Sequence, residues 1–89
     1  MTYYRVHEIS KNDYIKKYDD YIIIENDFKT AIDKYKRAVN CAIELNKINH
    51  ILQQHTIHQV LIDKITADTT EQAKNYNGTN IKIITGYNY

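Results

Sequence analysis

The sequence predicts an α+β fold: a small two-layer domain in which one long amphipathic helix packs on a three- or four-stranded antiparallel sheet, in the chain order β-β-α-β-β. Apolar residues recur at helical spacing in the middle of the chain. Runs rich in β-branched and aromatic residues lie before and after this stretch. A helix lying on one face of a sheet buries both apolar surfaces. With 89 residues, the chain is expected to form a single domain, residues 1–89.

Two strands are expected before the helix, at residues 3–9 and 20–25. Both segments favour β-structure, and three consecutive isoleucines in the second indicate a strand that is covered on both faces or central in its sheet. The polar residues between the two segments are typical of a turn. Residues 14–19 fit either a short helix or an irregular loop, because their apolar residues are spaced like one helical turn.

The long helix is expected to run from residue 27 to about residue 53. Asn26 or Asp27 can cap it by accepting a hydrogen bond from a backbone N–H of the first turn. The apolar face of this helix consists of Phe28, Ala31, Ile32, Tyr35, Val39, Ala42 and Ile43. A second apolar stripe lies beside it and is formed by Cys41, Leu45, Ile48 and Leu52. This widening predicts that the C-terminal half of the helix is more deeply covered.

The chain after residue 53 has two interpretations. Residues 56–66 form either a strand or a second helix, and their β-branched residues favour the strand. The remaining expected elements are one helical turn at residues 69–73, a turn at Asn77-Gly78 and a final strand at residues 79–85.

The charge balance argues against two classes of function. Twelve Lys and Arg residues stand against eleven Asp and Glu residues, which gives a formal net charge of +1. A nucleic-acid-binding domain carries a clear basic excess, and a protein that imitates DNA is strongly acidic. The basic residues of the helix are interleaved with acidic ones, as on a solvated face. Nucleic acid is therefore not the expected partner.

No residue pattern in the sequence points to a catalytic mechanism or a cofactor. Ser10, the one serine, lies in an expected turn, and Cys41 is expected to be a small buried hydrophobe on the helix. Two glycines, Gly78 and Gly86, cannot form a phosphate-binding loop. Carboxylates flank the second strand at Asp19, Asp20, Glu25 and Asp27, where solubility and helix capping explain them. The chain is therefore expected not to be an enzyme.

Three histidines, His50, His55 and His58, lie within nine residues, with Asp63 nearby. Histidine clusters hold zinc in many proteins. The spacing of these three residues matches no standard zinc pattern, and they do not share one face of a strand. We therefore expect polar residues around a helix end rather than a metal site.

Tyrosine is the most unusual feature of the composition, because it supplies nine of the ten aromatic residues. A domain of this size cannot bury all of them, and exposed tyrosines are enriched in protein interfaces. The candidate interface residues are Tyr3, Tyr14, Tyr18, Tyr76 and Tyr87. An alternative is codon bias, since Ile, Lys, Asn, Tyr, Phe and Met supply 45 of the 89 residues and all have A/T-rich codons.

These observations favour a small non-catalytic protein–protein interaction module. The A/T-rich bias fits a low-GC bacterium or its phages and plasmids. Phage proteins of this size are often inhibitors of a host enzyme or defence system, CRISPR effectors included, so a host protein is the expected partner and steric blocking the expected mechanism. The alternatives are a nucleic-acid-binding regulatory domain and an oligomeric binder of a small molecule such as a nucleotide.

The sequence also leads to expectations about the cellular location and the oligomeric state of the protein. The sequence begins without an apolar signal segment and holds no apolar run near the 20 residues that a membrane span needs. A single cysteine fits a reducing compartment, so a cytoplasmic protein is expected, in the host cell if a phage encodes it. A homodimer is plausible, because one sheet cannot fill the wide apolar stripe of the helix.

Overall fold

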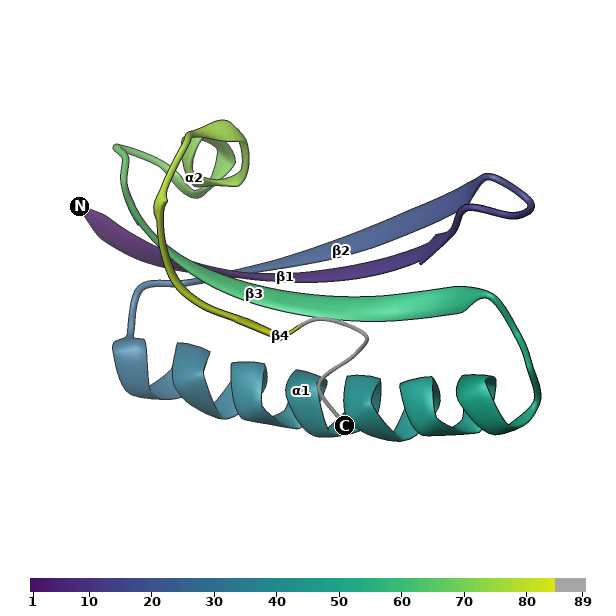
Figure 1. The fold of residues 1–89 in the computed structure, drawn as a ribbon. Helices are drawn as coiled ribbons and strands as arrows, with labels where there is room; N and C mark the ends of the chain where they lie inside the picture. Colours follow the sequence, from purple (N-terminus) through teal and green to yellow (C-terminus); the bar gives the residue numbers. More distant parts are fainter. Residues whose placement is uncertain (85–89) are drawn as a thin grey trace.

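The computed structural model describes the backbone of residues 1–84 and the side chains of residues 1–78. It confirms a small α+β domain with one long helix on an antiparallel sheet (Figure 1). The elements are β1 (Thr2–Asn12), β2 (Lys17–Glu25), α1 (Phe28–Ile51), β3 (Thr56–Thr66), α2 (Thr70–Asn75) and β4 (Thr79–Ile84). The strands lie in the spatial order β2-β1-β3-β4, and every neighbouring pair is antiparallel.

β1 and β2 form a long hairpin whose register pairs Tyr4 with Glu25 at one end and Asn12 with Lys17 at the other. Both strands are longer than predicted. Residues 17–19 belong to β2, so the expectation of a helix or an irregular loop is wrong for them. Pairing with β1 outweighs the local helical spacing, as tertiary context often does for strands.

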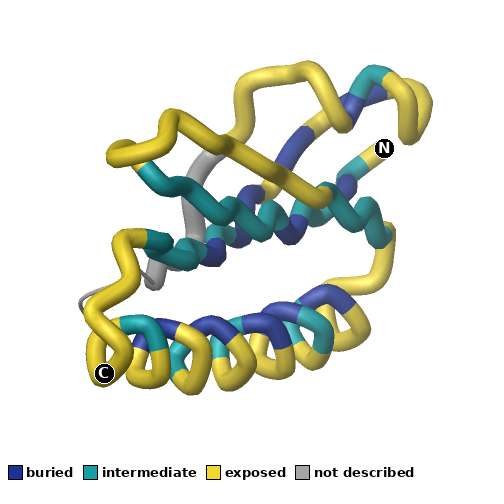
Figure 2. Tube along the Cα trace, turned by 90° about the vertical axis from the view of Figure 1, so that its right-hand side faces the viewer, coloured by how far each residue is buried: buried dark blue, intermediate teal, exposed yellow. Residues whose placement is uncertain are grey.

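Residues 56–66 form a strand, β3, as the β-branched residues predicted. β3 lies beside β1 along its whole length. The main hydrophobic core lies between α1 and the sheet, and its buried members are Val6, Ala31, Tyr35, Ala38, Ala42, Val60 and Ile62. Three of the four α1 members are alanines, which allow the helix axis to approach the strands closely. Figure 2 shows these buried positions along the side of α1 that faces the sheet.

α1 begins at Phe28, because Asp27 caps it and accepts a hydrogen bond from the backbone N–H of Thr30 at 2.9 Å. A hydrogen bond from the Thr30 hydroxyl and, to a smaller extent, the one from the Thr30 backbone N–H lower the pKa of Asp27. The helix ends at Ile51, two residues earlier than expected, and Gln53 follows in the left-handed region at φ 56°.

The expectation that the C-terminal half of α1 is more deeply covered is wrong. Leu45, Ile48 and Leu52 are 39%, 50% and 59% exposed, and Cys41 is exposed as well. α1 packs chiefly against β3 and β1. A helix about 10 Å wide covers only about two strands that are spaced 4.8 Å apart. The second apolar stripe of α1 therefore lies beyond the strands that the helix covers.

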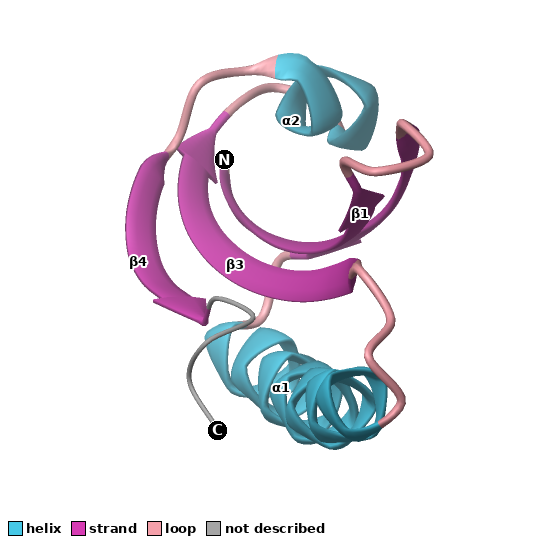
Figure 3. Ribbon diagram, turned by 45° about the vertical axis from the view of Figure 1, so that its right-hand side comes forward, coloured by secondary structure: helices cyan, strands magenta, loops and turns pink. Residues whose placement is uncertain are grey.

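The sheet curves, with α1 on its convex side and α2 on its concave side, at the end where β1 begins (Figure 3). A second hydrophobic cluster joins α2 to the sheet and consists of Tyr3, Ile65, Ala67 and Ala73. Gly78 leads from α2 into β4. A Cβ at this position would lie 2.5 Å from Cγ1 of Ile65 and 2.9 Å from the carbonyl oxygen of Lys64. The glycine is therefore required by close approach to β3.

Candidate functional site

The turn between β1 and β2, together with the start of β2, presents three large exposed side chains, which we call the hairpin tip: Tyr14, Ile15 and Tyr18. They are 80%, 64% and 59% exposed. The tip lies at the end of the sheet opposite α2 (Figure 1). Exposed large side chains on one turn are unusual, because apolar surface in water is unfavourable unless a partner covers it.

The tip has a fixed backbone because Asn12 holds it. The side-chain oxygen of Asn12 accepts hydrogen bonds from the backbone N–H groups of Tyr14 at 3.0 Å and Ile15 at 3.2 Å. Its amide nitrogen donates to the Thr56 hydroxyl at 3.1 Å, which ties the turn to β3. Lys16 closes the turn in the left-handed region, at φ 54°. The side chain of Asn12, the last residue of β1, thus orders the backbone of the tip.

A ring contact holds Tyr14, and a hydrogen bond holds Tyr18. Tyr14 stacks on His55, in the loop after α1, with ring centroids 5.0 Å apart and an interplanar angle of 20°. The Tyr18 hydroxyl donates a hydrogen bond to Asp13 at 3.0 Å. That hydrogen bond raises the pKa of Tyr18, because it favours the protonated hydroxyl beside a carboxylate.

The candidate interface tyrosines do not share one surface. Tyr14 and Tyr18 lie together at the tip. Tyr3 is only 6% exposed and belongs to the cluster under α2, so the expectation of a single tyrosine surface is wrong for it. Tyr76 is 44% exposed but follows α2 at the far end of the sheet. Tyr87 lies outside the described residues.

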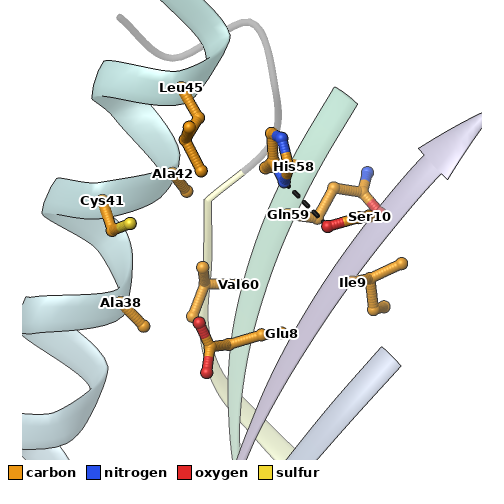
Figure 4. Close-up of a pocket in the computed structure, with 10 residues that line it drawn as sticks. All are labelled: Glu8, Ile9, Ser10, Ala38, Cys41, Ala42, Leu45, His58, Gln59 and Val60. Carbon is orange, nitrogen blue, oxygen red and sulfur yellow. Dashed lines mark hydrogen bonds between the residues drawn. The ribbon is translucent and has the colours of Figure 1, made fainter. Parts of the chain in front are cut away.

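A groove runs between α1 and the distal half of the β1–β2 hairpin, and three adjoining depressions of the surface share Ser10 in their lining. Figure 4 shows the depression that lies under α1. The depression under α1 holds about 40 Å³, and the two open ones hold about 300 and 250 Å³. The walls and floor include Glu8, Ser10, Asp19, Tyr21, Cys41, Leu45 and His58. The enclosed part has room for water but not for a nucleotide, which needs a pocket of about 300 Å³ or more.

Ser10 and His58 form a polar pair on the floor of this groove. The Ser10 hydroxyl lies 2.8 Å from Nδ1 of His58. Burial lowers the pKa of His58 below its ordinary value of 6.5, so the ring is neutral at pH 7. We interpret the contact as a structural hydrogen bond between two partly buried polar side chains.

Asn46 fixes the strand that carries His58. Within residues 1–84, β4 pairs with β3 over Val60–Lys64. At His58, the side chain of Asn46 takes both backbone hydrogen bonds: it accepts from the N–H at 2.9 Å and donates to the carbonyl at 3.1 Å. Asn49 donates in the same way to the Thr56 carbonyl at 3.0 Å. These two residues are not among those predicted from the sequence, although their i,i+3 spacing on the helix is a usable signal.

The remaining polar candidates have separate surroundings. No group of three or more potential metal ligands lies together within residues 1–84. His55 stacks on Tyr14 and His58 contacts Ser10, so these two rings have different partners. Glu25 pairs with Lys34 of α1. The expectation that Cys41 is buried is wrong, because it lies on the exposed stripe of α1.

Comparisons with known proteins identify no relative. The chain matches no known protein family, no curated protein and no solved structure. Neither helix of the described part of the chain has the length and the hydropathy to cross a membrane.

Proposed function

We propose that this chain is a non-catalytic protein-binding module that attaches to another protein through the hairpin tip. The observation that carries the proposal is the combination of exposure and order at the tip. Tyr14 and Ile15 are largely exposed, yet Asn12 and His55 hold the turn in place.

Physical chemistry favours such a tip as a binding element. Tyrosine offers a large contact area with a polar end, and it loses little side-chain entropy on binding. A turn that is already ordered has less conformational freedom to lose when it binds. Residues of this kind act as anchors when they enter a pocket of the partner.

The expected partner is a host protein, and the expected effect is steric. A phage-encoded module of this kind would inhibit a host enzyme or a defence system such as a CRISPR effector by covering its working surface. The net charge of +1 supports shape-based binding over imitation of nucleic acid.

The proposal is tested by affinity capture of host proteins on the purified chain, with matched variants. We expect one protein to bind in a fixed ratio to the wild-type chain. The double variant Tyr14→Ser/Tyr18→Ser should lose at least about tenfold in affinity, as anchor residues do. The control variant Tyr76→Ser changes an exposed tyrosine at the other end and should bind like wild type.

A third variant tests whether binding depends on the ordered backbone of the turn as well as on the contacts of its side chains. Asn12→Ala keeps the tip side chains but removes the hydrogen bonds that hold the turn. It should weaken binding by about threefold to tenfold, because the turn must then lose conformational freedom when it binds. Equal loss of binding by the tip variant and Tyr76→Ser would contradict the proposal, and so would capture of nucleic acid alone.

A further inference from the structure

Asn77 and Gly78 form the link between α2 and β4, at the end of the sheet that carries α2 (Figure 3). This is the one place in the sequence where a glycine follows an asparagine. Both residues lie outside the helices and strands, and both are exposed. The link therefore joins an open amide side chain to the residue type that least obstructs a reaction with it.

An asparagine side chain can react with the backbone that follows it. The backbone nitrogen of the next residue attacks the side-chain amide carbon and closes a succinimide ring, and the amide nitrogen leaves as ammonia. Water then opens the ring at either carbonyl, which gives aspartate or isoaspartate, whose main chain runs through the former side chain. The ring closes most easily before glycine, because glycine has no Cβ to obstruct it and tolerates unusual backbone angles.

The side chain of Asn77 is not held by the fold. Among the described residues, it has no hydrogen-bond partner. Asn75, two residues earlier, lies in α2 and donates a hydrogen bond to the Glu71 carbonyl oxygen at 3.3 Å. Asn26 and Asn40 are exposed as well, but the residues that follow them carry a Cβ. Exposure, a free amide and a following glycine thus coincide at Asn77.

We propose that Asn77 deamidates spontaneously in the folded protein, which converts it into aspartate and isoaspartate. The attacking atom is the backbone nitrogen of Gly78, which loses its proton, and the bond that breaks joins Cγ of Asn77 to its amide nitrogen. Water is the co-reactant, and nothing is oxidised or reduced. Because a neutral amide becomes a carboxylate, the formal net charge of the chain falls from +1 to zero.

The backbone is fixed on both sides of Asn77. On one side, the carbonyl oxygen of Tyr76 accepts a hydrogen bond from Arg5 at 3.0 Å. On the other side, Gly78 packs so closely on β3 that a Cβ there would lie 2.9 Å from the Lys64 carbonyl oxygen. Isoaspartate inserts an extra methylene into the main chain between these two fixed points, so α2 or the start of β4 must move.

The two products therefore differ in their effect on the fold. Aspartate keeps the original length of the main chain, and only isoaspartate weakens the docking of α2 on the sheet. The site lies at the far end of the sheet from the hairpin tip. The proposal is therefore independent of the proposed function, and either can fail without the other.

Peptide mapping after warm incubation at mildly alkaline pH tests the reaction. Trypsin releases residues 75–82 as one peptide, which contains Asn75, Asn77 and Asn80. Asn77 should be converted at least about tenfold faster than the other two, because it alone precedes a glycine. Isoelectric focusing should show a more acidic band for wild type and none for Asn77→Gln, whose side chain would have to close a larger ring.

A synthetic peptide of residues 75–82 serves as the control, because its reaction shows that the conditions are sufficient. An unmodified Asn77 in the folded chain, beside a converted peptide, would overturn the proposal. Equal conversion at Asn75 or Asn80 would overturn it as well, because the reaction would then not depend on the glycine.

Urea unfolding and hydrogen exchange test the consequence for α2. A chain synthesised with isoaspartate at position 77 is compared with Asn77→Asp, which has the same charge and the normal main chain. The isoaspartate chain should unfold at a lower urea concentration, and its α2 amides should exchange faster through local opening. Equal urea midpoints and equal exchange in the two chains would overturn the proposed effect on α2.

Discussion

Tyrosine is buried at one end of the sheet and exposed at the other. At the α2 end, Tyr3 is 6% exposed and packs with Ile65 and Ala73. At the hairpin end, Tyr14 is 80% exposed. The difference does not lie in the tyrosine itself. It lies in what the chain provides to cover each end: a short helix at one end and a self-held turn at the other.

Arg5 is the residue that closes the α2 end. Its guanidinium donates to the carbonyl oxygens of Lys74 and Tyr76, both at 3.0 Å, and thereby satisfies the end of α2. It also pairs with Asp63 of β3 at 3.0 Å. A single side chain thus ties the short helix to the sheet, whereas the hairpin end has no covering element among residues 1–84.

The largest expected effect comes from breaking the closed end. Arg5→Ala removes a mostly buried ion pair together with the hydrogen bonds to the end of α2. We expect the free energy of unfolding in urea to fall by about 3 kcal/mol. Arg37→Ala, an exposed change on α1, should alter it by less than about 0.5 kcal/mol. Similar values for both variants would show that Arg5 does not close this end.

The sequence alone predicted the positions of the helices and strands better than it predicted which of their residues are buried. The periods that distinguish helix from strand are local, so α1 and β3 were found correctly. Whether a residue is buried depends on contacts with segments that are distant in the sequence. Nothing in the spacing of Cys41, Leu45 and Ile48 shows that α1 packs chiefly on β3 and β1 and leaves this stripe uncovered. The stripe was therefore expected to be buried and is exposed.

The candidate site was predicted only in part for the same reason. The excess of tyrosine is visible in the composition, and Tyr14 and Tyr18 do lie together. The burial of Tyr3 depends on α2, a helix of six residues whose docking involves Arg5, nearly seventy residues away in the chain. A contact between residues so far apart in the chain produces no periodic pattern in the sequence.

The second largest effect is expected at Asn46, which completes the β3 backbone near the open end. Asn46→Ala leaves the backbone N–H and C=O of His58 without their partner. We expect a loss of about 2–3 kcal/mol in the free energy of unfolding. Asn40→Ala, at an exposed position of the same helix, should be neutral or slightly stabilising. A loss below about 1 kcal/mol for Asn46→Ala would mean that water replaces this contact.

The pH dependence of the free energy of unfolding gives a further test, at His58 near the hairpin end. Burial lowers the pKa of His58 below 6.5, so the unfolded chain binds a proton at His58 more readily than the folded chain does. Stability should therefore fall as the pH drops through 6.5, until the folded form is protonated too. Chemical denaturation at about pH 7.5 and 5.5 should show a smaller decrease for His58→Gln than for wild type. An equal decrease in both proteins would place the responsible group elsewhere.

The smallest effect on stability is expected at the tip. Tyr14→Ser/Tyr18→Ser replaces exposed side chains and should change the free energy of unfolding by less than about 0.5 kcal/mol each. The same double variant should lose partner binding. A stability loss above about 2 kcal/mol would instead mean that the tip tyrosines serve the fold.

The most direct measurement is NMR titration of the labelled chain with the captured partner protein. Amide shifts report which residues meet the partner. If the open end is the interaction surface, the largest changes will fall on residues 12–18 and on His55, with little change at Arg5, Ala73 and Tyr76. Changes centred on α2, with an unperturbed tip, would contradict the division between a closed structural end and an open binding end.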